Sequence, residues 1–207
     1  WMNMKAAVLG AYSVHMTNTN GLPDPNHQMS AADLASLTAY AMQNDFFAEI
    51  VGSKYVEIGE ASSYRYYKNT NKLLWQDEHI VGVKTGTTDA AGPCLVAAYE
   101  DGAALFISVV FDSPDRYGES LSLLKYGADQ YILIYLPCQN EDLAYLPADD
   151  GGVLLRADHD LQALIKTDQL TDISLVWRFA TDGGTLALVN EAGEELASTS
   201  LSLVVRE

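Results

Sequence analysis

The sequence predicts an α+β fold in which an antiparallel sheet is flanked by helices and followed by a small all-β domain. Three apolar segments follow one another between residues 79 and 113, and the turn-forming residues "YEDGA" join the last two. Segments with helical periodicity precede and follow them. After residue 138 the chain changes to short alternating runs separated by Gly and Asp. These patterns predict two domains, residues 1–137 and 138–207.

The first third of the chain is predicted to be helical around a turn-rich segment. Residues 2–10 have the pattern of a helix end, and residues 15–28 are rich in Asn, Gly, Pro and Asp, which favour turns. The clearest helix is predicted for residues 30–51. Ser30 is suited to its N-cap, and Asp33 stands three residues later, as in a capping box.

The middle of the chain is predicted to form strands and then a helix. Residues 53–68 alternate and are aromatic, which indicates a β-ribbon or an extended segment. Strands are predicted for residues 79–86, 92–102 and 103–113. A helix is predicted for residues 114–133, because Pro and Asp stand at its start and leucines recur at helical spacing.

The charge of the chain excludes one class of partner. With 12 Lys and Arg against 28 Asp and Glu, the formal net charge is −16 and the pI is near 4.4. Nucleic acid is therefore not an expected partner, since phosphates are bound by clustered cations. No apolar run approaches the roughly 20 residues that span a bilayer. Residues 1–12 lack the layout of a secretion signal, so a removed signal and an upstream segment both stay open.

Cysteine and histidine give no evidence of a metal or cofactor. The two cysteines, Cys94 and Cys138, are far apart and form no C-x-x-C motif. They are interpreted as small apolar core residues, and a disulfide between them stays open. The four histidines have no metal-ligand spacing. We expect no cofactor and no metal.

The segment "GVKTGTTDAAG" carries the chemistry that the sequence predicts most clearly. Lys84 is a fixed positive charge at the end of a predicted strand beside an apolar sheet, where it attracts anions more strongly than in water. Thr85 adds a hydroxyl on the neighbouring pleat, and Gly86 lets another backbone approach closely. The backbone at Thr87 is expected to face a ligand, which an extended peptide could reach by strand addition.

Six blocks of the chain, in order, resemble one known family. They are "MNMKAAVLGA", "TNTNGLPD", "HQMSAADLA", "NTNKLLW", "VGVKTGTTDAAGPCLVAA" and "LFISVVFDSPDRYGESLSLLKYG". The chain resembles the serine D-alanyl-D-alanine carboxypeptidases, the low-molecular-mass penicillin-binding proteins of the β-lactamase and transpeptidase superfamily. Thr19 and Asn20 replace a Pro and a His of the family pattern, and Thr70 replaces a residue that is often basic. The resemblance implies a β-lactamase/transpeptidase-like sheet, present in part.

The resemblance also implies roles for residues of this sequence. Lys84 would tune proton transfer in the active-site cleft and hold the acidic end of the substrate. Thr85 would bind the terminal carboxylate of D-alanine beside Gly86, and the N–H of Thr87 would form half of an oxyanion hole. Arg116 would be a second carboxylate anchor.

Weaker and competing interpretations accompany these roles. Thr88 is a weaker substrate-binding candidate, Lys84 could be an ordinary exposed lysine at a strand end, and Arg116 could pair with Glu119 on a helix surface. Hydrogen bonding within turns and loops is the favoured interpretation for four other polar residues. These are Asn20, His27, Asn69 and Asn71.

The nucleophile of the family is not found in the matching blocks. The reaction needs Ser-x-x-Lys and Ser-x-Asn, which in the family precede the first block. "SLLK" at Ser122–Lys125 follows the lysine strand and is interpreted as a chance match, as is "YKN" at residues 67–69. Two hypotheses follow. The chain is either a part of a carboxypeptidase that supplies one wall of the site, formed by the Lys84–Gly86 strand (the KTG strand), but not the nucleophile, or it is a non-catalytic cell-wall module.

The resemblance implies partners and a location. The expected ligands are peptidoglycan pentapeptides ending in D-Ala-D-Ala and β-lactams, and the expected protein partner is an N-terminal half that carries the serine. A β-lactamase is less favoured, and an endopeptidase would use the same site. The family works outside the cytoplasmic membrane, at the cell envelope. Without its other half, the chain is expected to aggregate or dimerise through exposed apolar faces and a sheet edge.

Overall fold

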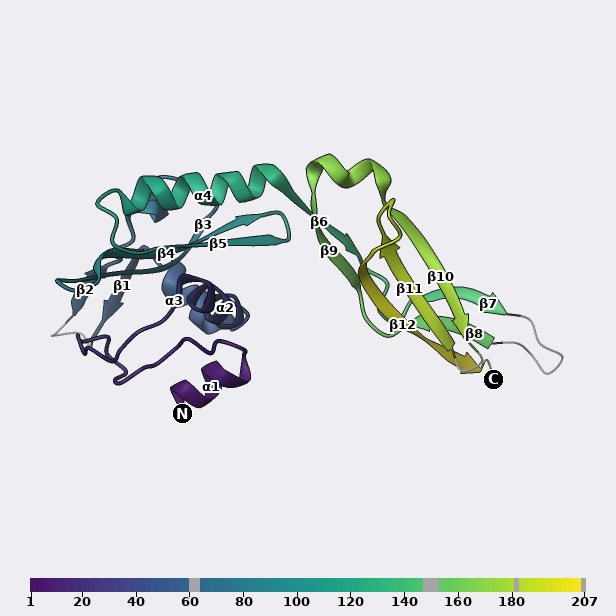
Figure 1. The fold of residues 1–207 in the computed structure, drawn as a ribbon, viewed down its shortest axis with the longest axis horizontal. Coiled ribbons are helices and arrows are strands. Elements are labelled where there is room, and N and C mark those ends of the chain that lie inside the picture. The colour runs from purple at the N-terminus through teal and green to yellow at the C-terminus, as the bar shows by residue number, and fades with distance from the viewer. Residues whose placement is uncertain (60–63, 147–152, 181–182, 206–207) are drawn as a thin grey trace. The chain divides into compact units, whose positions relative to one another are not determined.

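A computed structural model describes residues 1–59, 64–146, 153–180 and 183–205. The chain divides into two compact units, Trp1–Ala128 and Asp129–Glu207 (Figure 1). This division precedes the boundary predicted at residues 137/138. The reason is that β6 (Tyr131–Leu136) pairs along its whole length with β9 (Leu161–Lys166) of the second unit.

The first unit is built on a three-stranded antiparallel sheet in the order β3-β4-β5. β1 and β2 form a separate antiparallel ribbon. The elements of the first unit are α1 (Met2–Val8), α2 (Ala31–Met42), α3 (Asp45–Gly52), β1 (Tyr55–Ile58), β2 (Arg65–Lys68), the 3-10 helix η1 (Lys72–Trp75), β3 (Ile80–Thr88), β4 (Gly92–Asp101), β5 (Ala104–Val110) and α4 (Arg116–Gln130). The predicted β-ribbon, three strands and following helix are all confirmed; residues 60–63 of the ribbon lie outside the described residues.

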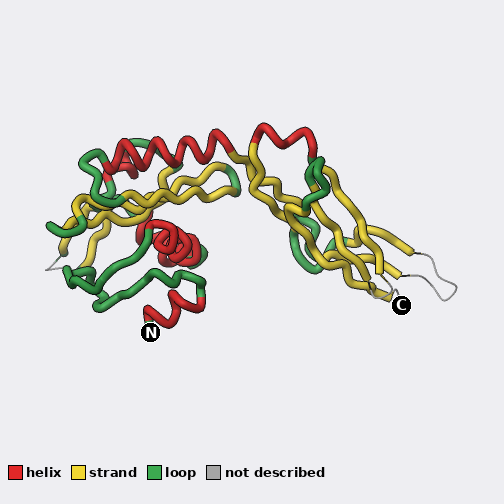
Figure 2. Tube along the Cα trace, viewed as in Figure 1, coloured by secondary structure: helices red, strands yellow, loops and turns green. Residues whose placement is uncertain are grey.

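Helices cover both faces of the sheet, α4 on one and α2 with α3 on the other (Figures 1 and 2). The alternation of side chains along β4 explains this layering. Leu95 and Ala97 pack with Leu124 of α4, whereas Val96 and Ala98 pack with residues of α2 and α3. Because β4 is buried on both faces, its apolar run is continuous and does not alternate with polar residues.

The prediction of one continuous helix over residues 30–51 is wrong, because this segment forms two helices, α2 and α3. Asn44 adopts an extended conformation, and its side chain accepts a hydrogen bond of 3.0 Å from the N–H of Phe47, so it caps a new helix. At the start of α2, Ser30 is the N-cap as predicted and accepts from Asp33 N at 3.1 Å. The Asp33 carboxylate instead accepts from the backbone and hydroxyl of Ser13.

Two other predicted boundaries are corrected by strand pairing. The helix predicted for residues 114–133 ends at Gln130, and Tyr131 begins a strand. The strand predicted for residues 79–86 continues to Thr88, so Lys84 lies in the middle of β3 and not at its end. The end of β3 pairs with the start of β4 across a short turn, Thr88 with Gly92, whereas Tyr131 pairs with the distant Lys166 of β9.

A turn at residues 69–71 ties the ribbon to the sheet by amide hydrogen bonds. Asn71 is fully buried, donates to the carbonyl of Gly82 at 2.8 Å and accepts from the N–H of Leu73 at 3.1 Å. Asn69 donates to the carbonyls of Val51 and Ser53. The interpretation of these asparagines as backbone partners is confirmed.

The second unit is a β-structure of two antiparallel sheets. One has five strands in the order β10-β11-β12-β8-β7, and the other pairs β6 with β9. Its remaining elements are β7 (Asp142–Leu146), β8 (Val153–Ala157), the 3-10 helix η2 (Thr167–Asp172), β10 (Ser174–Ala180), β11 (Gly183–Val189) and β12 (Glu195–Val205). Every second residue of β9 is buried, and Leu161, Ala163 and Ile165 form a core with Leu155 and Leu186 of the larger sheet. Among the described helices, none is long and apolar enough to cross a membrane.

Asn71→Ala is expected to destabilise the first unit by about 2 kcal/mol, because a buried carbonyl and a buried N–H lose their partner. Urea unfolding followed by tryptophan fluorescence measures this loss. Asn44→Ala is the matched control: it removes only a helix cap and should cost about 1 kcal/mol. Equal losses for the two variants would contradict the anchoring role of Asn71.

Candidate functional site

The KTG strand presents its side chains on both sides of a sheet edge. β3 is the outer strand of the three-stranded sheet in the described part of the chain. Thr85 pairs with Leu95, whose side chain packs on the α4 side, and Lys84 pairs with Val96, which packs on the α2 and α3 side. Directly paired residues share a face, so Lys84 and Thr85 flank the strand edge from opposite faces.

Arg116, the first residue of α4, is held against the KTG strand. Its guanidinium donates to the carbonyl of Gly86 at 2.8 Å, to Oγ1 of Thr87 at 2.9 Å and to the carbonyl of Cys94 at 3.2 Å. All three hydrogen bonds are donated by one nitrogen, Nη1, which therefore lies between β3 and β4, while Nη2 donates to the hydroxyl of Tyr117 at 3.4 Å. The ion pairs of the described residues do not include one between Arg116 and Glu119, so the alternative interpretation of Arg116 is wrong.

Thr85 is buried, and its hydroxyl lies 2.6 Å from the hydroxyl of Thr70. The carbonyl of Thr70 in turn accepts from the hydroxyl of Tyr117 at 3.1 Å, and the Arg116 guanidinium lies 5.1 Å from the centre of the Tyr117 ring. The contact of Thr70 with Thr85 and the presence of Tyr117 beside the site were not predicted. The position of Tyr117 next to Arg116 in the sequence is the signal that could have indicated Tyr117.

The remaining candidates differ in their surroundings. The Lys84 side chain is exposed, and its ammonium contacts the carbonyl of Thr85 at 2.5 Å. A Cβ at Gly86 would meet no atom within 4 Å, so close packing within the described chain does not require a glycine there. Thr88 accepts from Ala91 N at 3.0 Å in the β3–β4 turn and lines a 560 Å³ cavity with residues 21–25 and 27. The structure thus brings Thr85, Gly86, Thr87 and Arg116 together, and places Lys84 and Thr88 at the margins.

The chance match "SLLK" is not arranged for nucleophilic chemistry. Ser122 donates to the carbonyl of Gly118 at 2.8 Å, as exposed helical serines commonly do. The Lys125 ammonium forms an ion pair with Asp77 at 3.1 Å. Asp77 also accepts from His79, and these hydrogen bonds lower the pKa of its carboxyl to about 2.

The described residues contain no group of three His, Cys, Asp or Glu side chains placed to hold a metal ion. Cys94 and Cys138 are both free cysteines. Cys94 pairs with Gly86 across the strands, and its thiol donates to the carbonyl of Ala91 at 3.3 Å. His27 contacts Thr17 within its loop, consistent with an ordering role for the imidazole.

Comparison with known proteins identifies the family. The peptidase S11 model, described as D-alanyl-D-alanine carboxypeptidase, matches residues 1–115. The chain belongs to this family. The D-alanyl-D-alanine carboxypeptidase DacF of Bacillus subtilis is 26% identical over 219 residues, which covers 97% of this chain and 56% of that protein. DacA of Escherichia coli is 34% identical over 179 residues, covering 83% of this chain and 44% of that protein.

A solved structure shows the same fold. Penicillin binding protein 5 from Haemophilus influenzae superposes with a TM-score of 0.76 at 24% identity, over 99% of this chain and 64% of that one. The predicted β-lactamase/transpeptidase-like sheet with a following β-domain is therefore confirmed. The chain spans about half the length of the curated relatives described above.

The Asp77 carboxylate is expected to stabilise the first unit only above acidic pH. Its pKa falls from 3.8 in the unfolded chain to about 2 when folded, so its contribution is present above pH 4 and lost as pH falls towards 2. Asp77→Asn should lower the free energy of unfolding by only about 1 kcal/mol at pH 7. The loss is small because the partners of Asp77, His79 and Lys125, are half exposed and solvent weakens their interaction with the carboxylate. Thermal melts at pH 7 and pH 2.5 test this; an equal effect at both would contradict it.

Proposed function

We propose that residues 84–88 and Arg116 form the substrate-gripping wall of a serine-type D-Ala-D-Ala carboxypeptidase that trims the terminal D-alanine of peptidoglycan stem peptides. The observation that carries the proposal is the convergence of Arg116 on Gly86 and Thr87 at the edge of the KTG strand. A peptide that adds to this edge would have Lys84 on one side and Thr85 with Arg116 on the other. Two cations and a hydroxyl would then bracket its terminal carboxylate.

Thr85 and Thr70 act as a pair in this proposal. A hydroxyl has one proton to donate and two lone pairs that accept. When Thr70 donates to Thr85, the Thr85 proton is left to donate to the carboxylate of D-alanine. Thr70 is thus a positioning residue, while Thr85 is the residue that touches the substrate.

Thr87 and Lys84 serve the reaction itself. The N–H of Thr87 is assigned to the oxyanion hole, where one donor contributes roughly 3 kcal/mol to stabilising the tetrahedral state. Lys84 brings a positive charge to the edge where the acyl carbon reacts, and assists proton transfer there. Thr88 stays a weaker candidate because its hydroxyl is used in the turn.

The nucleophilic serine is supplied, in this proposal, by polypeptide outside the 207 residues. Ser122 is already bonded to a backbone carbonyl, and Lys125 to Asp77, so the internal match offers no activated hydroxyl. The alternative is a non-catalytic cell-wall module derived from the same family. An endopeptidase that acts on cross-links would use the same wall.

Peptidoglycan lies outside the cytoplasmic membrane, so we assign the protein to the cell envelope. The β-lactams resemble the D-Ala-D-Ala terminus and are expected to acylate the same serine. This gives a covalent readout of the assembled site.

Fluorescent penicillin is expected to label a mixture of the 207-residue chain with the polypeptide that carries Ser-x-x-Lys and Ser-x-Asn, and to leave the 207-residue chain alone unlabelled. The reason is that the acylated serine and the KTG wall lie on different segments. Gel fluorescence after denaturation detects the covalent adduct. Label on the lone chain would contradict the assignment of the serine, and no label in the mixture would favour the non-catalytic module.

Arg116→Ala is expected to slow acylation of the assembled site by roughly tenfold to a hundredfold, since a charge-assisted hydrogen bond to carboxylate is lost. Arg116→Lys should recover only part of the rate, because an ammonium lacks the fork of donors. Lys125→Ala removes a cation from the same helix outside the wall and is the control. A rate for Arg116→Ala equal to that of the control would contradict the anchor.

A further inference from the structure

A cavity of 560 Å³ opens beside the turn between β3 and β4. One wall is formed by Thr88, the last residue of β3, with Ala90 and Ala91 of the turn. The other wall is the loop of residues 21–25 and 27, which precedes α2. The lining is largely apolar and includes one carboxylate, that of Asp24. A ligand group with an apolar stem and a cationic end would match both features of this lining.

The loop that forms the second wall is held in shape by its own hydrogen bonds. The backbones of His15 and Gln28 bond each other at 2.8 and 3.0 Å and so close the loop at its base. The side chain of Asn18 accepts from the N–H of Gly21 at 2.8 Å and donates to the carbonyl of Leu22 at 3.0 Å. The wall is therefore formed before a ligand arrives, which lowers the entropic cost of binding.

Asp24 is partly buried in this wall, and one of its carboxylate oxygens is left for a ligand. Its Oδ1 accepts from the N–H of Asn26 at 2.8 Å, which orients the carboxylate. The hydrogen bonds and ion pairs found among the described residues give Oδ2 no partner. A carboxylate held in this way can still accept a charge-assisted hydrogen bond from an ammonium group.

A peptide on the edge of β3 would lead into this cavity. In the proposed function, the terminal carboxylate of the peptide lies at Thr85 and Arg116, and the carbonyl that reacts lies at the N–H of Thr87. Followed from its C-terminus, the peptide therefore runs from Thr85 towards Thr88. An extended chain advances by about 3.3 Å per residue. The residue that precedes D-Ala-D-Ala is then placed beside Thr88, at the mouth of the cavity.

We propose that the cavity binds the side chain of the residue that precedes D-Ala-D-Ala, and that it selects an aliphatic side chain ending in an amine. The apolar stem would pack on Leu22, Pro25 and Ala91, and the ammonium would pair with Asp24. A side chain that ends in a carboxylate would be repelled by Asp24. The inference rests on the proposed function, because that function sets the direction of the peptide. It adds Asp24 to the substrate wall as a residue that determines specificity.

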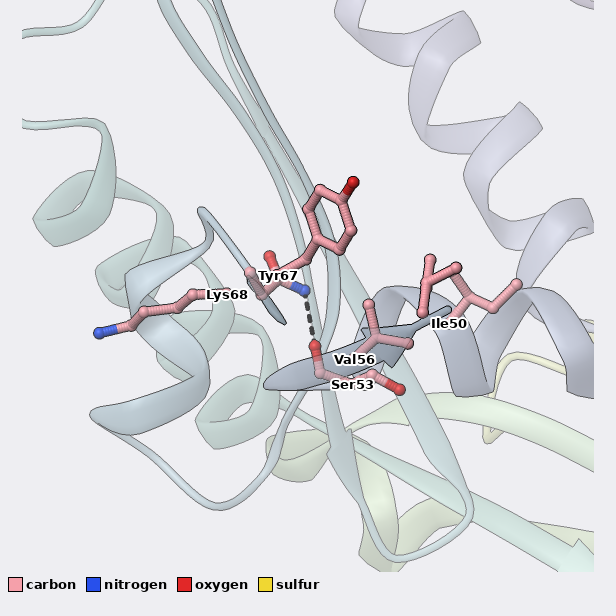
Figure 3. A pocket seen from close by; sticks show the side chains of 7 residues that line it. Ile50, Ser53, Val56, Tyr67 and Lys68 are labelled. Carbon is pink, nitrogen blue, oxygen red and sulfur yellow. Dashed lines mark hydrogen bonds between the residues drawn. The ribbon is translucent and has the colours of Figure 1, made fainter. Parts of the chain in front are cut away.

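Another cavity of the first unit does not match the same ligand group. The 280 Å³ cavity beside the β1–β2 ribbon is lined by residues that include Ile50, Val56, Tyr67 and Lys68 (Figure 3). Its lining contains an ammonium group and no carboxylate, so an amine would meet a like charge there. A preference for an amine therefore distinguishes the cavity at Thr88 from the cavity at the ribbon.

Binding of short peptides to the 207-residue protein tests the proposal without the reaction. The probes are Nα-acetyl-L-Lys-D-Ala-D-Ala, which has a free side-chain amine, and its Nε-acetylated form, whose side chain is neutral. Isothermal titration at low salt should show that the free amine binds about fivefold more tightly. This difference should shrink as salt rises, because salt screens the ion pair.

Asp24→Asn should remove the preference for the free amine. The substitution keeps an acceptor for the N–H of Asn26 but loses the charge. Asp101→Asn removes an equal charge at the opposite end of β4 from the β3–β4 turn, so it is the matched control and should leave the preference unchanged. Melting curves show whether each variant folds.

The outcomes separate this inference from the proposed function. Arg116→Ala should weaken the binding of both peptides alike, because the anchor of the terminal carboxylate is lost. If it does so while the unaltered protein binds both peptides equally, the wall is supported and the assignment of the cavity is overturned. A preference that persists in Asp24→Asn overturns the assignment as well. If neither peptide binds, or if Arg116→Ala changes nothing, the proposed function fails and this inference fails with it.

Discussion

The arrangement of the site depends on the hydrogen bonds that Arg116 donates to β3 and β4. A single guanidinium joins two backbone carbonyls and one hydroxyl at the point where α4 begins. It therefore fixes the start of the helix relative to the strand edge, and with it the Tyr117 ring that reaches Thr70. Because carbonyls are the partners, the charge is oriented without being neutralised, so it can still attract a carboxylate.

The three residues of the turn at 69–71 have two functions: the outer two fix the backbone, and the middle one contacts the site. The side chains of Asn69 and Asn71 bond buried backbone groups and set the path of the turn. Thr70, between them, contacts the hydroxyl of Thr85. The positive charge at this end of the unit comes from Lys68 and Lys72, one on either side of the turn.

Much of the fold could be predicted because its local signals agree with one another. The three sheet strands and the helix that begins at Arg116 follow from apolar runs and turn residues. The break at Asn44 was missed because the apolar spacing continues across it, although an Asn before Asp is itself a capping signal. The faces of Lys84 and Thr85 could not be predicted, since they depend on register with β4. Contacts such as that of Thr70 with Tyr117 join residues far apart in sequence and need the packed sheet.

The position of Lys84 in the middle of an edge strand has a consequence for solubility. Exposed strand edges invite pairing with the edges of other molecules, and a lysine on such a strand opposes this by charge repulsion and hydration. Lys84 puts such a charge on β3, so it limits the pairing of this edge with another molecule without removing the exposed edge itself. In the proposed function the same ammonium also meets the ligand, so a variant that neutralises it would lose both effects at once.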